Sequence, residues 1–176
     1  MARRPALPAG LYVAGRRVVA VGDASAREPA LRAAGAVVDR VAARAWTPDR
    51  CAGAFLVLLP ASLPEPAARR IAADARRRGV LVYAEDRPDL SDLAMPAVAR
   101  RGAVAVAVST DGVAPALAAR LRDDLQTQLD AAGGDLDRLV DGFEAARGRT
   151  GSAHPPAPRV RWTGEIRVEP DGGDPA

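Results

Sequence analysis

The sequence predicts an α/β fold in which short, buried strands alternate with helices and form a parallel sheet. Three observations support this prediction. Apolar residues make up 48% of the 176 residues, which is enough for one packed domain with a small appendage. Short apolar runs alternate with segments of helical periodicity along most of the chain. Glycines end several of these segments, as is common where a helix gives way to a strand.

Five apolar runs predict the strands. Each is four to six residues long, and most are almost continuously apolar, which is typical of parallel strands covered on both faces. The first run ends at Gly22, and the third is the strongest of the early ones. The runs are residues 18–21, 36–41, 55–59, 80–83 and 103–108.

Four segments predict helices. In the first, Pro29 is compatible with a helix only near its start. The second has arginines at its C-terminal end, where positive charge is favourable. The third has apolar residues at every fourth position and hence one apolar face. The helical segments are residues 26–34, residues 64–78, residues 115–131 and a further helix capped by Asp135. The apolar stripe of the third segment is Val113, Leu117, Leu121, Leu125 and Leu129.

These elements divide the chain into three parts. We expect a Rossmann-like domain over residues 1–112, a small helical region over residues 113–148 and a flexible tail over residues 149–176. The tail begins with a stretch rich in proline and glycine, and residues 159–169 alternate enough to form a lone strand.

Charge and composition exclude several classes of function. The net charge is +3, which suits a small polyanionic ligand. The arginines occur in pairs rather than in a stripe with aromatic residues, so a nucleic acid is not expected as the ligand. One cysteine and one histidine exclude an internal disulfide and a Cys/His zinc cluster. No apolar run is long enough to span a membrane, and no apolar segment typical of a signal peptide follows Met1. We therefore expect a soluble, cytoplasmic protein without a metal site.

Three loops contain residue types that could bind ligands. The first is Gly22-Asp23-Ala24, directly after the first strand. A dinucleotide-binding fold has glycines there, which allow a pyrophosphate to approach the backbone. Here Gly22 is the one glycine, and Asp23 has the wrong sign of charge for a phosphate. A cofactor loop and a plain strand-to-helix turn are both compatible with this sequence.

The other two loops follow later strands. Asp86 lies at the end of the fourth strand, where ligands bind in open α/β sheets and where a carboxylate can act as a general base. Alternatively, it stabilises the turn before Pro88. Ser109, Thr110 and Gly112 lie between the fifth strand and a helix, so their hydroxyl and amide groups could bind an anion or cap the helix.

Taken together, residues 80–122 resemble the N-terminal module of siroheme synthase, the family of precorrin-2 dehydrogenase and sirohydrochlorin ferrochelatase. The matching stretches run in the same order as in the family, and the weaker similarity extends over about residues 7–129. The stretches are Asp86-Arg-Pro-Asp-Leu-Ser-Asp-Leu-Ala-Met-Pro96, Val98-Ala-Arg-Arg-Gly-Ala-Val-Ala-Val-Ala-Val-Ser-Thr-Asp-Gly112 and Ala114-Pro-Ala-Leu-Ala-Ala-Arg-Leu-Arg122.

The resemblance implies a homodimeric enzyme that oxidises precorrin-2 to sirohydrochlorin with NAD⁺ and then inserts Fe²⁺, its second substrate, to give siroheme. The tetrapyrrole has many carboxylates, so arginines are expected to bind it. The implied residues are Asp86 for catalysis, Gly22, Asp23 and Ala24 for the cofactor, and Ser109, Thr110, Gly112 and Arg100 for the substrate, with Arg87, Arg101, Arg120 and Arg122 as further partners.

The cofactor side departs from the family pattern. Asp23 and Ala24 replace two glycines of the family's Gly-Gly-Gly loop, and the segment that follows is shorter. Tyr83 stands where the family has an asparagine before the catalytic aspartate. These departures leave an alternative, a non-catalytic relative that binds a tetrapyrrole or a partner protein and has lost NAD binding.

Overall fold

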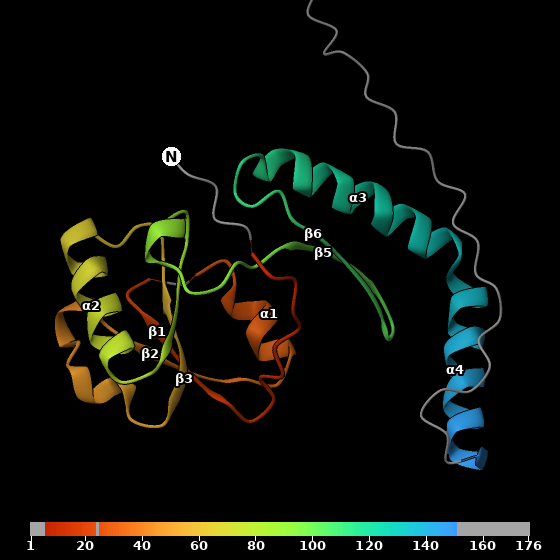
Figure 1. Cartoon of the computed structure of the whole chain (residues 1–176), viewed down its shortest axis with the longest axis horizontal. Helices are drawn as coiled ribbons and strands as arrows, with labels where there is room; N and C mark the ends of the chain where they lie inside the picture. Colours follow the sequence, from red (N-terminus) through yellow and green to blue (C-terminus); the bar gives the residue numbers. More distant parts are fainter. Residues whose placement is uncertain (1–5, 24, 151–176) are drawn as a thin grey trace, which may run out of the picture.

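The computed structural model describes residues 6–23 and 25–150, and a four-stranded parallel sheet forms the core of its first half (Figure 1). All three pairs of neighbouring strands are parallel, so the predicted α/β class with a Rossmann-like sheet is confirmed. Each of the first four predicted strands is present within one residue of its expected bounds. The strands are β1 (Arg17–Val21), β2 (Val37–Val41), β3 (Ala54–Leu59) and β4 (Leu81–Ala84), in the order β2-β1-β3-β4.

Helices cover both faces of this sheet. α1 (Glu28–Ala33) lies on one face and α2 (Glu65–Arg77) on the other (Figure 1). Because successive residues of a strand point to opposite faces, Val19 belongs to the core cluster of Ile71 in α2, whereas Val18 belongs to that of Leu31 in α1. α1 begins two residues later than predicted. Three short 3-10 helices lie in the connections, namely η1 (Ala43–Ala45), η2 (Pro48–Cys51) and η3 (Pro88–Leu90).

The predicted fifth strand does not join the parallel sheet, which corrects the prediction. It is β6 (Val104–Val108), and it pairs antiparallel with β5 (Ala97–Arg101), a strand that the sequence did not predict. Gly102, with a φ of +52°, allows the chain to reverse so tightly that β6 pairs with the residues just before it. α3 (Pro115–Ala131) packs on this hairpin, and α4 (Gly133–Thr150) follows it.

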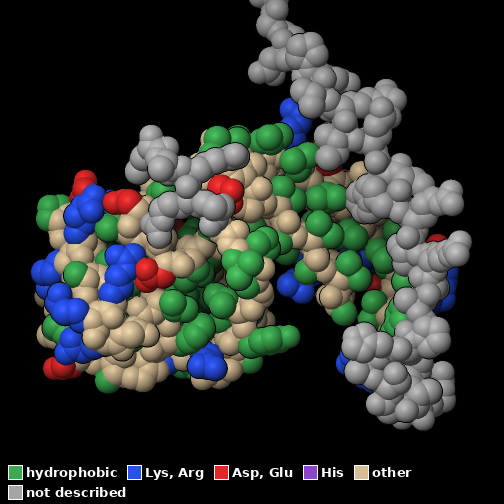
Figure 2. Space-filling model, in the orientation of Figure 1, with side chains coloured by type: hydrophobic (Ala, Val, Ile, Leu, Met, Phe, Trp, Pro, Cys, Tyr) green, Lys and Arg blue, Asp and Glu red, His purple; other side chains and the backbone are tan. Residues whose placement is uncertain are grey.

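The apolar stripe of α3 is buried at its end but not at its start. Leu129 is 5% exposed, whereas Leu117 is 52% exposed and Val113, just before the helix, is 67% exposed. Figure 2 shows apolar side chains on the surface over the hairpin and α3. The two-stranded hairpin is therefore too small to cover the first half of the stripe.

The remaining predictions concern other parts of the chain. Ala24, the tail from residue 151 and the lone strand over residues 159–169 lie outside the described residues, and the domain boundary at residue 112 stays a prediction. Within the described residues, no helix is both long and apolar enough to cross a membrane.

Candidate functional site

The segment after β4 holds Asp86 in an exposed turn at the carboxyl end of the parallel sheet. The backbone φ of Asp86 is +57°, in the left-handed region that aspartate tolerates better than most side chains. Its carboxylate has no hydrogen-bond or ion-pair partner among the residues that the structure describes. A free carboxylate beyond the ends of parallel strands can accept a proton from a bound molecule.

The residues on either side of Asp86 are tethered, one to the end of β3 and the other to the loop that follows β3. The N–H of Glu85 donates to the carbonyl oxygen of Leu59, at the end of β3, at 2.9 Å. Arg87 donates from Nη2 to the carbonyl oxygen of Leu63 at 2.6 Å. Arg87 was expected to bind substrate carboxylates. Its Nη2 instead bonds to the backbone after β3 and so fixes the turn that contains Asp86. Asp86 is thus the untethered residue between two fixed neighbours.

The turn itself is held by residues further along the chain. The N–H of Ala84 donates to Oγ of Ser91 at 3.0 Å, and Ser91 is buried. The N–H of Val82 donates to Oδ2 of Asp92 at 2.9 Å, and the N–H of Asp92 donates to the carbonyl oxygen of Val82 at 2.8 Å. These bonds return the chain alongside β4. Among the described residues, the side chain of Asp86 adds no hydrogen bond to this turn, and its contribution there is its tolerance of a positive φ.

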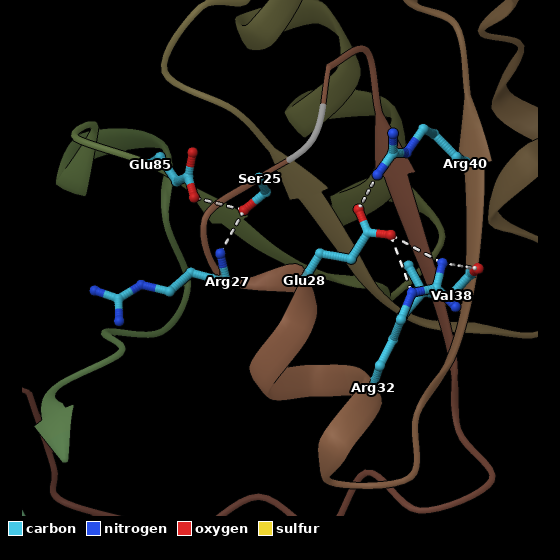
Figure 3. Close-up of polar contacts among 7 residues, drawn as sticks. All are labelled: Ser25, Arg27, Glu28, Arg32, Val38, Arg40 and Glu85. Atoms are coloured by element: carbon cyan, nitrogen blue, oxygen red, sulfur yellow. Dashed lines mark hydrogen bonds and ion pairs between the residues drawn. The ribbon is translucent and has the colours of Figure 1, made fainter. Parts of the chain in front are cut away.

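The loop between β1 and α1 lies at the same edge of the sheet. Gly22 has a φ of +78°, and a Cβ added to it would lie 3.8 Å from Cγ of Pro60, so the turn itself leaves room. Asp23 is exposed and accepts a hydrogen bond from Oγ of Ser62 at 3.3 Å. Ser25 is 3% exposed, and its Oγ donates to Oε1 of Glu85 at 2.5 Å (Figure 3).

Among the described residues, the helix start that follows this loop offers few N–H groups to a dinucleotide pyrophosphate. A pyrophosphate needs free N–H groups in the loop and in the first turn of the following helix. The N–H of Arg27 donates to Oγ of Ser25 at 3.1 Å, and that of Glu28 donates to the carbonyl oxygen of Ser25 at 3.1 Å. Pro29 has no N–H. The first turn of α1 therefore offers few free donors, and it begins with an acidic side chain.

Glu28 is the buried acidic residue of this region, and its contacts join α1 to β2 (Figure 3). Arg40 donates to its Oε2 at 2.7 Å, and Arg32 donates to its Oε1 at 2.8 and 3.1 Å. The hydrogen bond from Arg40, followed by that from Arg32, lowers the pKa of Glu28, although burial opposes the shift. Arg32 also donates to the carbonyl oxygen of Val38 at 3.0 Å. These contacts indicate a structural role for Glu28.

The predicted substrate loop after β6 uses its hydroxyl groups locally. The N–H of Asp111 donates to Oγ of Ser109 at 3.2 Å, and the N–H of Ala114 donates to Oγ1 of Thr110 at 3.2 Å, just before α3. Gly112 has a φ of +77° and closes the turn. No hydrogen bond or ion pair joins this loop to Asp86 among the described residues, and the loop belongs to the hairpin rather than to the parallel sheet.

The arginines implied as substrate partners divide into two groups. Arg101 forms ion pairs with Asp137 at 2.8 Å and Asp130 at 3.5 Å, which tie the hairpin to α3 and α4. Arg122 pairs with its neighbour Asp123 at 2.7 Å. The exposed side chains of Arg100 and Arg120 have no partner among the described residues. These two are free to bind an anionic ligand.

Sequence reasoning missed Ser25 and Glu85 as a pair. They lie 60 residues apart, and serine and glutamate are individually ordinary at these positions. The signal that could have indicated Glu85 is its place directly after a buried strand, next to Asp86. Nothing in the local sequence indicates its partner.

Comparison with known families gives two matches that follow one another along the chain. Residues 9–97 match the family described as "Putative NAD(P)-binding", and residues 101–128 match the family described as "Sirohaem biosynthesis protein central". The first match covers the four-stranded sheet and its flanking helices. The second covers the hairpin turn, β6 and most of α3.

Similar proteins include the siroheme synthase of Gluconacetobacter diazotrophicus, 33% identical over 96% of this chain and 41% of that protein. The siroheme synthase of Methylococcus capsulatus is 36% identical over 61% of this chain and 23% of its own length. The chain thus spans less than half the length of these relatives. Among solved structures, "SirC, precorrin-2 dehydrogenase" matches with a TM-score of 0.63 at 17% identity, over 84% of this chain and 83% of that one, which shows a shared fold.

Proposed function

The chain belongs to the NAD(P)-binding family that forms the N-terminal module of siroheme synthases, and from this premise we propose that it is an enzyme of siroheme biosynthesis. In this proposal it oxidises precorrin-2 to sirohydrochlorin, the dehydrogenase step, and inserts Fe²⁺ into sirohydrochlorin. The observation that supports the proposal best is the free carboxylate of Asp86, which the structure holds between two tethered residues at the carboxyl end of the sheet.

Both reactions remove protons from the tetrapyrrole. Oxidation removes a hydride and a proton from precorrin-2, and metal insertion releases the protons of two pyrrole nitrogens as Fe²⁺ binds to them. Asp86 is the proposed proton acceptor in either reaction. The family implies NAD⁺ as the hydride acceptor. Because the N–H groups of Arg27 and Glu28 at the start of α1 are occupied by Ser25, we assign no residue of this chain to that step.

Substrate binding and assembly are part of the same proposal. Arg100 and Arg120 are the proposed electrostatic partners of the substrate carboxylates, because their guanidinium groups have no partner among the described residues. A second copy of this chain is the proposed partner for the exposed apolar residues Val113 and Leu117.

The decisive experiment compares Asp86→Asn with the wild-type chain in two absorbance assays, sirohydrochlorin formation from precorrin-2 with NAD⁺ and metal insertion into sirohydrochlorin. Asparagine keeps the shape and tolerates the left-handed backbone, so the thermal midpoint should not change. We expect a loss of about 10²-fold or more in each reaction that the wild type performs. Asp89→Asn, three residues away in the same turn, is the matched control. Activity retained in Asp86→Asn would refute the role of Asp86.

A second candidate function is a non-catalytic relative that binds a tetrapyrrole or a partner protein. The occupied N–H groups of Arg27 and Glu28, at the start of α1, favour this alternative. A wild-type chain that binds sirohydrochlorin but performs neither reaction would identify it as such a binder.

A further inference from the structure

Two hydrogen bonds cross the edge of the sheet at which a dinucleotide would lie. Oγ of Ser25, after β1, donates to Oε1 of Glu85, after β4, at 2.5 Å (Figure 3). Oγ of Ser62, after β3, donates to Oδ2 of Asp23 at 3.3 Å. Because β3 lies between β1 and β4, the Ser25–Glu85 bond passes over the carboxyl end of β3. Ligands of open α/β sheets bind where the strand order reverses, which is here beyond β1 and β3.

The Ser25–Glu85 bond is part of a buried, fixed arrangement. Ser25 is 3% exposed and uses both of its oxygens, since its Oγ also accepts from the N–H of Arg27 and its carbonyl oxygen accepts from that of Glu28. On the other side, the backbone of Glu85 is bonded to Leu59 at the end of β3. Both partners are therefore held in place by contacts other than their own bond.

Charge opposes phosphate binding at the same place. Glu28 is neutralised by Arg32 and Arg40, but Asp23 and Glu85 have no basic partner among the described residues. Two uncompensated carboxylates thus border a position that would receive the negatively charged pyrophosphate. Dinucleotide-binding loops have the opposite arrangement, with free N–H groups and the positive end of a helix dipole.

We propose that the Ser25–Glu85 hydrogen bond closes the dinucleotide position, so that NAD⁺ binds weakly and only when this bond opens, and that Glu85 determines the affinity. The proposal rests on the proposed function, in which NAD⁺ is the hydride acceptor. Replacing Glu85 by glutamine removes the charge and weakens the bond without changing the size of the side chain. Replacing Ser25 by alanine removes the bond and frees the N–H of Arg27.

Isothermal titration of the whole 176-residue chain with NAD⁺ tests this proposal. We expect a Kd above about 1 mM for the wild type and binding about tenfold tighter for Glu85→Gln. Ser25→Ala should shift the Kd in the same direction. Asp89→Asn removes one negative charge from the same turn without touching the bond, and it should leave the Kd unchanged.

Three results would overturn the proposal. They are micromolar binding by the wild type, the same gain in Asp89→Asn as in Glu85→Gln, and no binding by any variant. Folding is checked for each variant by its thermal midpoint. Metal insertion into sirohydrochlorin requires no NAD⁺, so its loss in Asp86→Asn tests the proposed function separately from this closure.

Discussion

Replacing Glu28 by glutamine should destabilise the fold, because the carboxylate joins α1 to the edge strand β2. Glu28 accepts one hydrogen bond from Arg40 and two from Arg32, at 2.7 to 3.1 Å, and its side chain is 8% exposed. A hydrogen bond to a charged group is worth about 1.5–3 kcal/mol, and exposed ion pairs are worth less. Both arginines are about half exposed, so we estimate a loss of about 1–2 kcal/mol in the free energy of unfolding.

The effect should depend on pH in a defined direction. The pKa of Glu28 is lowered in the folded state, so its ionised form stabilises the fold at pH values above 4.5, its ordinary pKa. This stabilisation is lost as the pH falls through the lower, folded-state pKa. The stability difference between the wild type and Glu28→Gln should therefore be constant from pH 7 to pH ~5.5 and shrink below pH ~4.5.

Urea unfolding followed by tryptophan fluorescence at several pH values measures this difference, since Trp46 is buried in the core. Glu65→Gln is the matched control, because Glu65 is an exposed partner of Arg69 one helix away and its loss should change stability little. An equal loss in both variants, or a difference that grows as the pH falls, would contradict the assignment of Glu28 as the ionised anchor of α1.

Two further predictions concern the backbone and the assembly. Gly35→Ala should cost about 1–2 kcal/mol of unfolding free energy, because Gly35 has a φ of +84° and a new Cβ would lie 3.2 Å from that of Ala14. Gly10→Ala, which meets nothing within 4 Å, should cost less in the same urea titration, and equal costs would contradict the strain argument. Leu117→Glu should convert a dimer to a monomer in light-scattering measurements without lowering the thermal midpoint, because Leu117 is 52% exposed in one chain. A monomeric wild type would refute the proposed dimer.

The strands of the parallel sheet could be predicted because each is buried on both faces and so must be apolar along its length. β3, with Leu56 to Leu59 fully buried, is the clearest example. β5 could not be predicted in this way, since it has Arg100 and Arg101 at its end and one largely exposed side. Its pairing depends on the turn at Gly102 and on Gln126 of α3, which hydrogen-bonds both the N–H and the carbonyl oxygen of Arg100.

The candidate site likewise has one part that the sequence predicts and one part that it does not. The place of Asp86 at the end of a buried strand follows from local pattern, because the direction of a parallel strand fixes which end carries the ligand-binding edge. The hydrogen bond between Ser25 and Glu85 does not follow from it. The two residues lie 60 positions apart, and such a contact exists only once β1, β3 and β4 are assembled side by side. The pattern of apolar residues in the sequence predicts which residues are buried. Tertiary packing determines which polar groups come together at the edge of the sheet.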